Sequence, residues 1–590
     1  MSLSKLESLP NELLLDLFEN YIDGTDLLTV FLHQFNERFD ALLSQTRIYF
    51  NFIGCHLDTF RYSLRVLPDY ANRITKLALS ERDTPGQINM FFACFPSFAP
   101  FEQLRSLYIY CSGQGINSKS VQTAILTLVD TKIETLTVKM IKGACFPSWI
   151  TVISTIFTLT TLRRLLLAFP PRYTTWKAQL TTLLNIEHLT VTGLQCDWNT
   201  LASFSRYMPH LKYLNVDVDD HFFSPLVAHY QFVPMLKLRA LFLYFCNGSI
   251  IGVLRQYFDY TPALYRLTVD GPDTFFEPEP WQALIEASLP QLRHFTLSTS
   301  IFRPRHQSNI YPTNLLTLYN NPFWMTKLNF NIIVIDHELQ GRYENAISEI
   351  CDSGNDIFRA DVSHRPVIQW WAADKHNSHG HVYYLNTITR LCISSLPDSS
   401  SHQYYFKNVT FLALYNLNSR LVEWILNCVN CSKIRELVIS FSDKETKAIN
   451  LLLQSTVNIQ SLKIDFDHLI PDRGASIRRN IHLKRLDLSN EPHAFRKKDI
   501  ATIAQYFPFL EHLVINTVDL NNVPLLEDHL PKLSTLTFRL PERYFHILNY
   551  FTSLDSSFSP FIIRQAENWI KIWLGDMAFH QVFWQRFTKI

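Results

Sequence analysis

Residues 508–538 read PFLEHLVINTVDLNNVPLLEDHLPKLSTLTF, and our interpretation of the chain starts from this stretch. The pattern Pro-x-Leu-x-x-(Leu/Phe)-x-apolar occurs in it twice, beginning at Pro508 and at Pro531. It begins three more times upstream, at Pro209, Pro262 and Pro290. Proline stops a preceding helix and favours an extended conformation in the residue before it. We therefore expect helices that alternate with short strands.

A shorter pattern, apolar-x-x-Leu-x-apolar, extends this alternation along most of the chain. Its central residues are Leu77, Leu107, Leu136, Leu165, Leu189, Leu214, Leu241, Leu267, Phe295, Leu328, Leu391, Leu412, Leu437, Leu462, Leu486, Leu513 and Leu536. The usual spacing is roughly 26 residues, which falls in the 20–29 range of leucine-rich repeats. A single helix–strand unit cannot bury its apolar face alone, so neighbouring units must stack. The pattern predicts a curved α/β leucine-rich-repeat solenoid with roughly 17–18 irregular repeats.

One interval in this series is longer than the others. Leu328 and Leu391 are 391 − 328 = 63 residues apart. The interval contains either a degenerate repeat, Ile357-x-x-Ala360-x-Val362, or an inserted loop. We expect a linker or capping segment at 46–70, the solenoid at 71–540 with an irregular insertion near 331–388, and an aromatic-rich cap at 541–590.

Composition limits the class of protein. The chain has 590 residues, of which 47% are hydrophobic and 18% charged, and its net charge is +1. It is too long for a single compact core, and it lacks the overall charge that would attract nucleic acid or an acidic membrane. We find no apolar run long enough for a membrane span and no signal-peptide pattern, and we interpret the ten cysteines as reduced thiols. We expect an intracellular protein, cytoplasmic or nuclear or both.

Residues 1–45 have a different character and are expected to form a separate all-α unit. After Pro10, the apolar residues Leu13, Leu17 and Phe18 follow at helical spacing. A turn signal at 23–24 precedes a second amphipathic stretch. The unit has a charge of −6, from two basic and eight acidic residues. Because it is too small to be stable alone, it must pack against the rest of the chain or a partner.

The segment LESLPNELLLDLFENYIDGTDLLTVFLHQFNERFDALL at 6–43 resembles an F-box, the helical motif that docks the Skp adaptor of SCF (Skp–cullin–F-box) ubiquitin ligases. Its most specific elements are Leu-Pro-x-Glu-Leu at 9–13 and Asp-Leu-Leu at 26–28. Where many F-boxes have Cys, a basic residue and Trp, this chain reads HQFNERF at 33–39. The resemblance implies binding to the Skp adaptor, and through it to a cullin, by Leu9, Pro10, Leu13, Leu17, Phe18 and Ile22.

The whole chain resembles an F-box protein with leucine-rich repeats. This resemblance implies a substrate-recognition subunit of an SCF-type E3 ubiquitin ligase, in which the F-box docks the adaptor and the concave face of the repeats binds a protein substrate. Such a subunit is not an enzyme. The alternative is a leucine-rich-repeat interaction scaffold with no ubiquitin role, whose amino-terminal hairpin is only a cap. Mobile, exposed residues 1–45 favour the first function, and residues packed into the first repeat favour the second.

Candidate substrate-binding residues follow from strand geometry. Because the central leucines face the core, the alternate strand positions line the opposite surface. Tyrosine and arginine at such positions are typical of protein-binding faces. The candidates are Tyr108, Tyr110, Tyr213, Phe242, Tyr244, Arg266, Tyr415 and Arg485.

Two clusters resemble chemical sites. The HxxHxH at His376, His379 and His381 could bind zinc, but a polar loop is the favoured interpretation because no cysteine ligand lies close by. Cys428 and Cys431 form a CxxC for which helix-end packing is favoured over a redox pair. The sequence contains no GxxxxGK[ST], HExxH or GxSxG motif. We therefore expect no catalytic residue, no metal and no cofactor, and give little weight to a hydrolase hidden between 328 and 391.

Overall fold

The chain forms two compact units, Met1–Ala240 together with Glu542–Ile590, and Leu241–Pro541. The computed structural model describes residues 9–31, 37–81, 84, 86–111, 118–140, 147–169, 175–176, 180–218, 230–245, 251–272, 278–301, 323, 329–336, 357–360, 371–372, 382–384, 390–393, 403–415, 417–440, 446–466, 482–489, 494–518, 523–539, 561–564 and 569–573.

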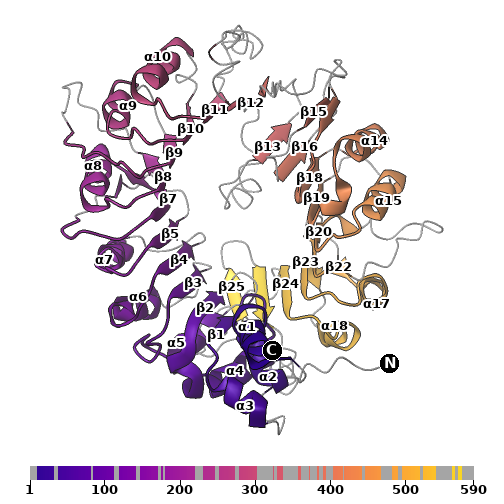
Figure 1. Ribbon diagram of the computed structural model, residues 1–590. Helices are drawn as coiled ribbons and strands as arrows, with labels where there is room; N and C mark the ends of the chain where they lie inside the picture. The colour runs from indigo at the N-terminus through magenta and orange to yellow at the C-terminus, as the bar shows by residue number, and fades with distance from the viewer. Residues whose placement is uncertain are drawn as a thin grey trace. The chain divides into compact units, whose positions relative to one another are not determined.

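The first unit contains a parallel β-sheet whose strands alternate with helices. In this unit the strands of the sheet are β1 (Ile48–Asn51), β2 (Ile74–Ser80), β3 (Ser106–Cys111), β4 (Thr135–Met140), β5 (Arg164–Ala168), β6 (Thr175–Trp176), β7 (His188–Cys196) and β8 (Tyr213–Val218). The unit also contains β25 (Phe561–Arg564) and β26 (Trp569–Trp573), an antiparallel pair that is not part of this sheet. Its helices are α1 (Asn11–Asn20), α2 (Gly24–Phe31), α3 (Glu37–Leu43), α4 (Leu57–Tyr70), α5 (Gln87–Cys94), α6 (Ser118–Leu126), α7 (Pro147–Ile156) and α8 (Trp198–Tyr207), with 3₁₀ turns η2 (Ala71–Arg73) and η3 (Thr127–Asp130). Helices α5–α8 lie along one side of the row of strands β2–β8 (Figure 1).

Neighbouring parallel strands of this unit are paired so that the recurring leucine of one strand lies opposite the recurring leucine of the next. The paired row is Leu77, Leu107, Leu136, Leu165, Leu189 and Leu214. All six side chains are buried. Because successive side chains of a strand point to opposite faces, the residues beside each leucine lie on the face away from this core.

Helix α8 illustrates how a helix ends and a strand begins in this unit. Asp197 caps it, since its Oδ1 accepts a hydrogen bond from the backbone N–H of Thr200 at 2.8 Å. Trp198, Leu201 and Phe204 then bury one helix face. The helix ends at Tyr207, two residues before a proline, and the chain then enters β8.

The amino-terminal helices pack against the edge of this sheet. A Cβ added to Gly24 of α2 would lie 2.6 Å from Ile48 Cγ2 of β1, so the two elements approach closely. Asp23 Oδ2 accepts a hydrogen bond from the backbone N–H of Asn51 at 2.8 Å, and Glu19 Oε1 accepts one from the N–H of Arg47 at 2.9 Å. Within 46–70, β1 pairs in parallel with β2 and is followed by α4. Residues 46–70 therefore belong to the sheet and its helical layer.

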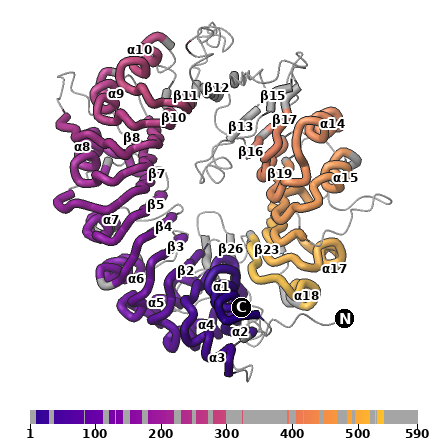
Figure 2. Tube along the Cα trace, in the orientation of Figure 1, coloured from indigo at the N-terminus to yellow at the C-terminus, as the bar shows by residue number. Residues whose placement is uncertain are grey.

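The second unit contains parallel strands and helices of the same kind. Its strands are β9 (Ala240–Phe245), β10 (Arg266–Pro272), β11 (His294–Ile301), β12 (Asn329–Asp336), β13 (Ile357–Ala360), β14 (Trp371–Ala372), β15 (Val382–Tyr384), β16 (Arg390–Ile393), β17 (Gln403–Tyr405), β18 (Phe411–Tyr415), β19 (Glu436–Ser440), β20 (Ser461–Lys463), β21 (Arg485–Leu488), β22 (Ala494–Phe495), β23 (His512–Val518) and β24 (Thr535–Arg539). Its helices are α9 (Ile251–Phe258), α10 (Pro278–Ser288), α14 (Ser419–Cys428), α15 (Thr446–Ser455), α17 (Lys497–Tyr506) and α18 (Val523–His529), with a 3₁₀ turn η5 (Cys431–Lys433). The tube in Figure 2 follows this alternation along the chain.

The strands of the second unit belong to separate sheets. In one, β10, β11 and β12 are parallel neighbours, and β14 pairs with β12 in the antiparallel sense. In another, β13, β16, β18, β19, β20, β21, β23 and β24 are parallel neighbours. Among the described strands, β12 has β11 as a parallel neighbour and β14 as an antiparallel one, and β13 pairs with β16 instead of β12. The recurring residues again pair in register, from Leu391 of β16 to Leu536 of β24.

The expected fold class, an all-α amino-terminal unit followed by one curved solenoid of roughly 17–18 repeats, is wrong. The structure instead has separate parallel β-sheets with helices. Helices α1 and α2 are not an independent all-α unit, because they pack on β1. The register expected near Leu328 also differs, since β12 begins at Asn329 and Phe330 pairs with Phe295. Apolar residues at 328, 330 and 332 fit the same two-residue period, so the sequence left that register open.

Candidate functional site

The amino-terminal helices present an apolar surface to solvent. On α1, Leu13 is 55% exposed, Leu17 is half-buried, and Tyr21, directly after the helix, is 75% exposed. These three residues follow at four-residue spacing and therefore share one side of the helix. We call this the α1 stripe. Large apolar side chains at this exposure on one helix face are typical of an interaction site.

The six residues expected to bind the adaptor differ in accessibility. Pro10 is exposed, and Leu9 and Ile22 are half-buried. Phe18 is only 1% exposed, and its ring packs edge-on against Phe39 of α3, with centroids 6.1 Å apart. Phe18 therefore belongs to the core of the helical segment rather than to its surface. Tyr21, which we did not list among these residues, completes the α1 stripe; its four-residue spacing from Leu17 was the available signal.

Side-chain hydrogen bonds hold the helix that carries the α1 stripe, and the neighbouring helix α2, in position. The Arg38 guanidinium of α3 donates from Nε to Asn11 Oδ1 at 2.7 Å, and its Nη2 donates to the carbonyl of Leu9. Asp23 Oδ1 accepts a hydrogen bond from the backbone N–H of Thr25 at 2.8 Å at the start of α2. Burial raises the pKa of Asp23, although its hydrogen bonds to Thr25 and Asn51 oppose the shift. These contacts hold α1 and α2 in place, so the exposed side chains are preorganised.

The candidate residues on the sheet face are spread over both units. Tyr108 and Tyr110 share β3, where Tyr108 is half-buried and Tyr110 is 9% exposed. Tyr213 is half-buried and stacks on His188 of the adjacent strand, with ring centroids 5.9 Å apart. The side chain of Tyr415 lies outside the described residues. Tyr108, Tyr110 and Tyr213 therefore do not offer a large exposed surface.

Two of the candidate substrate-binding residues in the second unit, Phe242 and Arg266, are in contact with each other. The Arg266 guanidinium lies over the ring of Phe242, 5.3 Å from its centroid, in a cation–π contact. Tyr244, two residues further along β9, is 46% exposed. Beside Arg266, His294 packs against Tyr265 with centroids 5.0 Å apart; burial lowers the pKa of His294. Arg485 is half-buried on β21. Tyr265 and His294 are not among the candidates predicted from the sequence.

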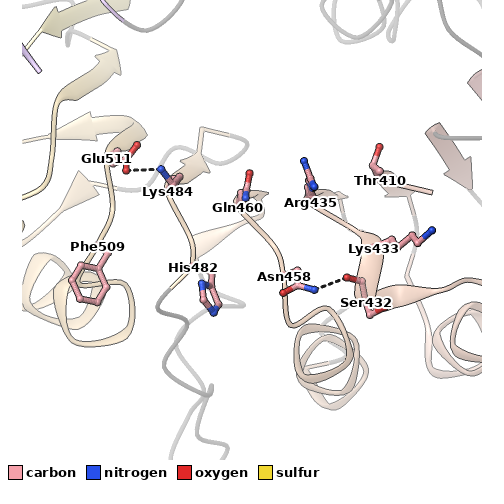
Figure 3. Close-up of a pocket in the computed structure, with 10 residues that line it drawn as sticks. All are labelled: Thr410, Ser432, Lys433, Arg435, Asn458, Gln460, His482, Lys484, Phe509 and Glu511. Carbon is pink, nitrogen blue, oxygen red and sulfur yellow. Dashed lines mark hydrogen bonds and ion pairs between the residues drawn. The ribbon is translucent and has the colours of Figure 1, made fainter. Parts of the chain in front are cut away.

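A shallow polar groove of about 640 Å³ lies at the ends of the strands where β19, β20, β21 and β23 begin. Its lining residues are Thr410, Ser432, Lys433, Arg435, Asn458, Gln460, His482, Lys484, Phe509 and Glu511. Figure 3 shows them in two rows. The row nearer the strands contains Thr410, Arg435, Gln460, Lys484 and Glu511; the other contains Lys433, Asn458, His482 and Phe509.

The residues that line this groove are not among the candidate sites predicted from the sequence. The residues of its first row occupy the second position of the recurring pattern, as in Ile434-Arg435-Glu436-Leu437. Aligning the copies on their leucines would have placed these side chains next to one another. We call this the edge row, and it recurs in the first unit.

Of the two clusters that resemble chemical sites, only the cysteine pair lies in the described residues. Burial raises the pKa of the Cys428 and Cys431 thiols to about 11 each, which disfavours the thiolate that redox chemistry needs. His376, His379 and His381 lie outside the described residues. Among the residues that are described, no group of histidine, cysteine or acidic side chains is arranged to hold a metal ion. No helix in that part of the chain is both long and apolar enough to cross a lipid bilayer.

Comparison of the sequence with models of known protein families and with curated proteins finds no match.

Proposed function

We propose that the protein is a substrate-recognition subunit of an SCF-type ubiquitin ligase, with helices α1 and α2 as the adaptor-docking element. One observation carries the proposal: the segment that resembles an F-box presents Leu13, Leu17 and Tyr21 on one exposed side of α1. Burying this stripe against the Skp adaptor would supply the apolar area that drives association. The stripe is preorganised by the Arg38 and Asp23 hydrogen bonds, which lowers the cost of ordering it on binding.

In this proposal the protein contributes no reacting group and works inside the cell. Its sheets hold a protein substrate while the adaptor and cullin bring a charged ubiquitin-conjugating enzyme nearby. Transfer accelerates because the effective concentration of substrate lysines rises. The protein needs no metal or cofactor for this role.

The sheet face of the second unit is the proposed region for substrate contact. Phe242 and Arg266 form a ready-made cation–π pair, and Tyr244 is exposed beside them on β9. Aromatic and arginine side chains of this kind dominate the energetics of protein interfaces.

A second function has an observation in its favour. Helices α1 and α2 pack against β1 through Gly24 and Asp23, which is the arrangement expected of a cap. A cap on an interaction scaffold would need no ubiquitin ligase. The α1 stripe points the other way, because a cap has no need for an exposed apolar side.

Affinity capture distinguishes the two functions. The full-length protein and its Leu13→Asp variant are captured from cell extract and analysed by mass spectrometry. Recovery of the Skp adaptor and a cullin with the unmodified protein alone supports the ligase function. Their absence from both samples leaves the scaffold, and their equal recovery with both variants excludes the α1 stripe as the docking site.

A further inference from the structure

From Arg105 to Lys212 the edge row of the first unit alternates in charge, and the next member, Arg239, is a second cation after Lys212. Arg105, Glu134, Arg163, Glu187 and Lys212 occupy equivalent positions, because each backbone N–H in this series bonds the carbonyl of the preceding member. Arg105 Nη1 lies 3.0 Å from Glu134 Oε1, Arg163 Nη1 lies 4.0 Å from Glu187 Oε1, and Lys212 Nζ pairs with Glu187 Oε2 at 2.5 Å. Each of these three cations therefore has a glutamate beside it.

The edge row of the second unit breaks this alternation. The same backbone bonds connect Thr410, Arg435, Gln460, Lys484 and Glu511. Lys484 Nζ pairs with Glu511 Oε1 at 2.9 Å, but the neighbours of Arg435 on both sides are uncharged. Among the described residues, Arg435 forms no ion pair, and its side chain is exposed. Glu436 follows Arg435 in sequence but is not a member of the edge row. It is the first residue of β19 and pairs in register with Phe411 and Ser461 on the two neighbouring strands.

The groove around Arg435 carries a net positive charge. Lys433, in the second row, donates to the neutral Asn408 Oδ1 at 2.8 Å and so keeps its charge uncompensated. The lining therefore has three permanent cations, Lys433, Arg435 and Lys484, and one carboxylate, that of Glu511. Figure 3 shows Arg435 and Gln460 side by side in the first row and Phe509 at the far end of the second row. Phe509 is exposed and offers an apolar contact there.

We propose that this groove binds an acidic peptide segment of a partner protein in an extended conformation, with a carboxylate of that segment on Arg435. The partner's carboxylate would take the position that a glutamate occupies beside Arg105 and beside Arg163 in the first unit. The proposal deepens the receptor function by naming the chemistry of the bound segment, and it rests on that function for its purpose.

The dimensions of the edge row fit such a peptide. Neighbouring strands are about 4.8 Å apart, so Arg435 and Lys484, two strands apart, are separated by about 10 Å along the row. A polyproline II segment rises about 3.1 Å per residue with three residues per turn, so every third side chain lies on one side at about 9 Å spacing. Acidic residues three apart would therefore meet Arg435 and Lys484 together. Lys484 has three N–H donors and uses one on Glu511, which leaves donors for the peptide.

The test uses the full-length protein and a labelled peptide of Glu-Pro-Pro units, about twelve residues long. Binding is measured by fluorescence anisotropy, with a Gln-Pro-Pro peptide of equal length as the uncharged probe. We expect the acidic peptide to bind, the uncharged one to bind at least about tenfold more weakly, and the affinity to fall as salt rises.

Three variants make the test specific to the groove. Arg435→Gln should weaken acidic-peptide binding by at least about fivefold, since it removes a charge-assisted bond. Gln460→Glu keeps Arg435 but gives it a neighbouring carboxylate like those beside Arg105 and Arg163, and it should weaken binding to a similar extent. Arg105→Gln is the matched control on the paired edge row and should leave binding unchanged.

The outcomes separate this inference from the adaptor proposal. If the two peptides bind equally, or if Arg105→Gln weakens binding as much as Arg435→Gln, the groove is not an acidic-peptide site. Peptide binding by Leu13→Asp protein should match that of the unmodified chain, because Leu13 lies outside the groove. Loss of adaptor capture with intact peptide binding, or the reverse, identifies which of the two proposals fails.

Discussion

Leu13→Asp is the sharpest perturbation of the proposed docking surface. Leu13 is 55% exposed in the free chain, so about half of its side chain remains to be buried by a partner. Full burial of a leucine contributes about 1.5–3 kcal/mol, and half of that is about 0.8–1.5 kcal/mol. Truncation to alanine should therefore weaken adaptor binding about four- to twelvefold. Aspartate adds several kcal/mol for desolvating its carboxylate, so we expect a loss of about a thousandfold or more.

The same substitution should leave the fold intact. Leu13 is the third residue of α1, where an acidic side chain interacts favourably with the helix dipole. Exposed positions of this kind change the free energy of unfolding by about 0.5 kcal/mol or less. Circular dichroism and urea unfolding of the purified variant should match those of the unmodified protein.

The assay is titration calorimetry of purified Skp adaptor into the full-length protein. Leu183→Asp provides the matched control, because Leu183 is 68% exposed in the same unit but is no part of α1 or α2. We expect Leu183→Asp to bind the adaptor normally. If Leu13→Asp binds within twofold of the unmodified protein, or if both variants lose binding equally, the assignment of the α1 stripe as a docking surface is wrong.

Three further substitutions test the packing described above. Phe18→Ala should lower the free energy of unfolding by about 3–5 kcal/mol in urea unfolding, since Phe18 is buried against Phe39; a change below about 1 kcal/mol would contradict its assignment to the core. Gly24→Ala should destabilise the first unit by about 1–3 kcal/mol, because the added Cβ meets Ile48 Cγ2 at 2.6 Å, and unchanged stability would show that α2 does not approach β1 so closely. Burial raises the pKa of Asp217 from 3.8 to about 6, so the folded state binds the proton of this carboxyl more tightly than the unfolded state does. The free energy of unfolding should therefore fall by up to about 3 kcal/mol as the pH rises from 3.8 to about 6. Asp217→Asn should remove this loss and be most stabilising above pH 6, and an identical pH dependence in both proteins would refute the shift.

Local pattern alone located many of the secondary structure elements. Proline at 209 and the apolar residues after it are sufficient to end a helix and start β8, because both effects act over a few residues. The recurring leucines from Leu77 to Leu214 pair in register because a two-residue period, which is also a local property, fixes which face of each strand is apolar. The helical character of 11–20 follows from the spacing of its apolar residues.

Tertiary structure decided what those elements pack against. Leu13 and Phe18 belong to the same apolar series on α1, yet Leu13 is exposed and Phe18 is buried, because α3 and β1 cover only one side of the helix. β14 pairs with β12 in the antiparallel sense, a contact between segments far apart in sequence that the repeating pattern does not predict. The sequence around Arg435 does not show that its neighbours in the edge row are uncharged, because folding places Thr410 and Gln460 beside it. Periodicity is a local property of the chain, whereas burial, sheet edges and charge compensation depend on residues that only folding brings together.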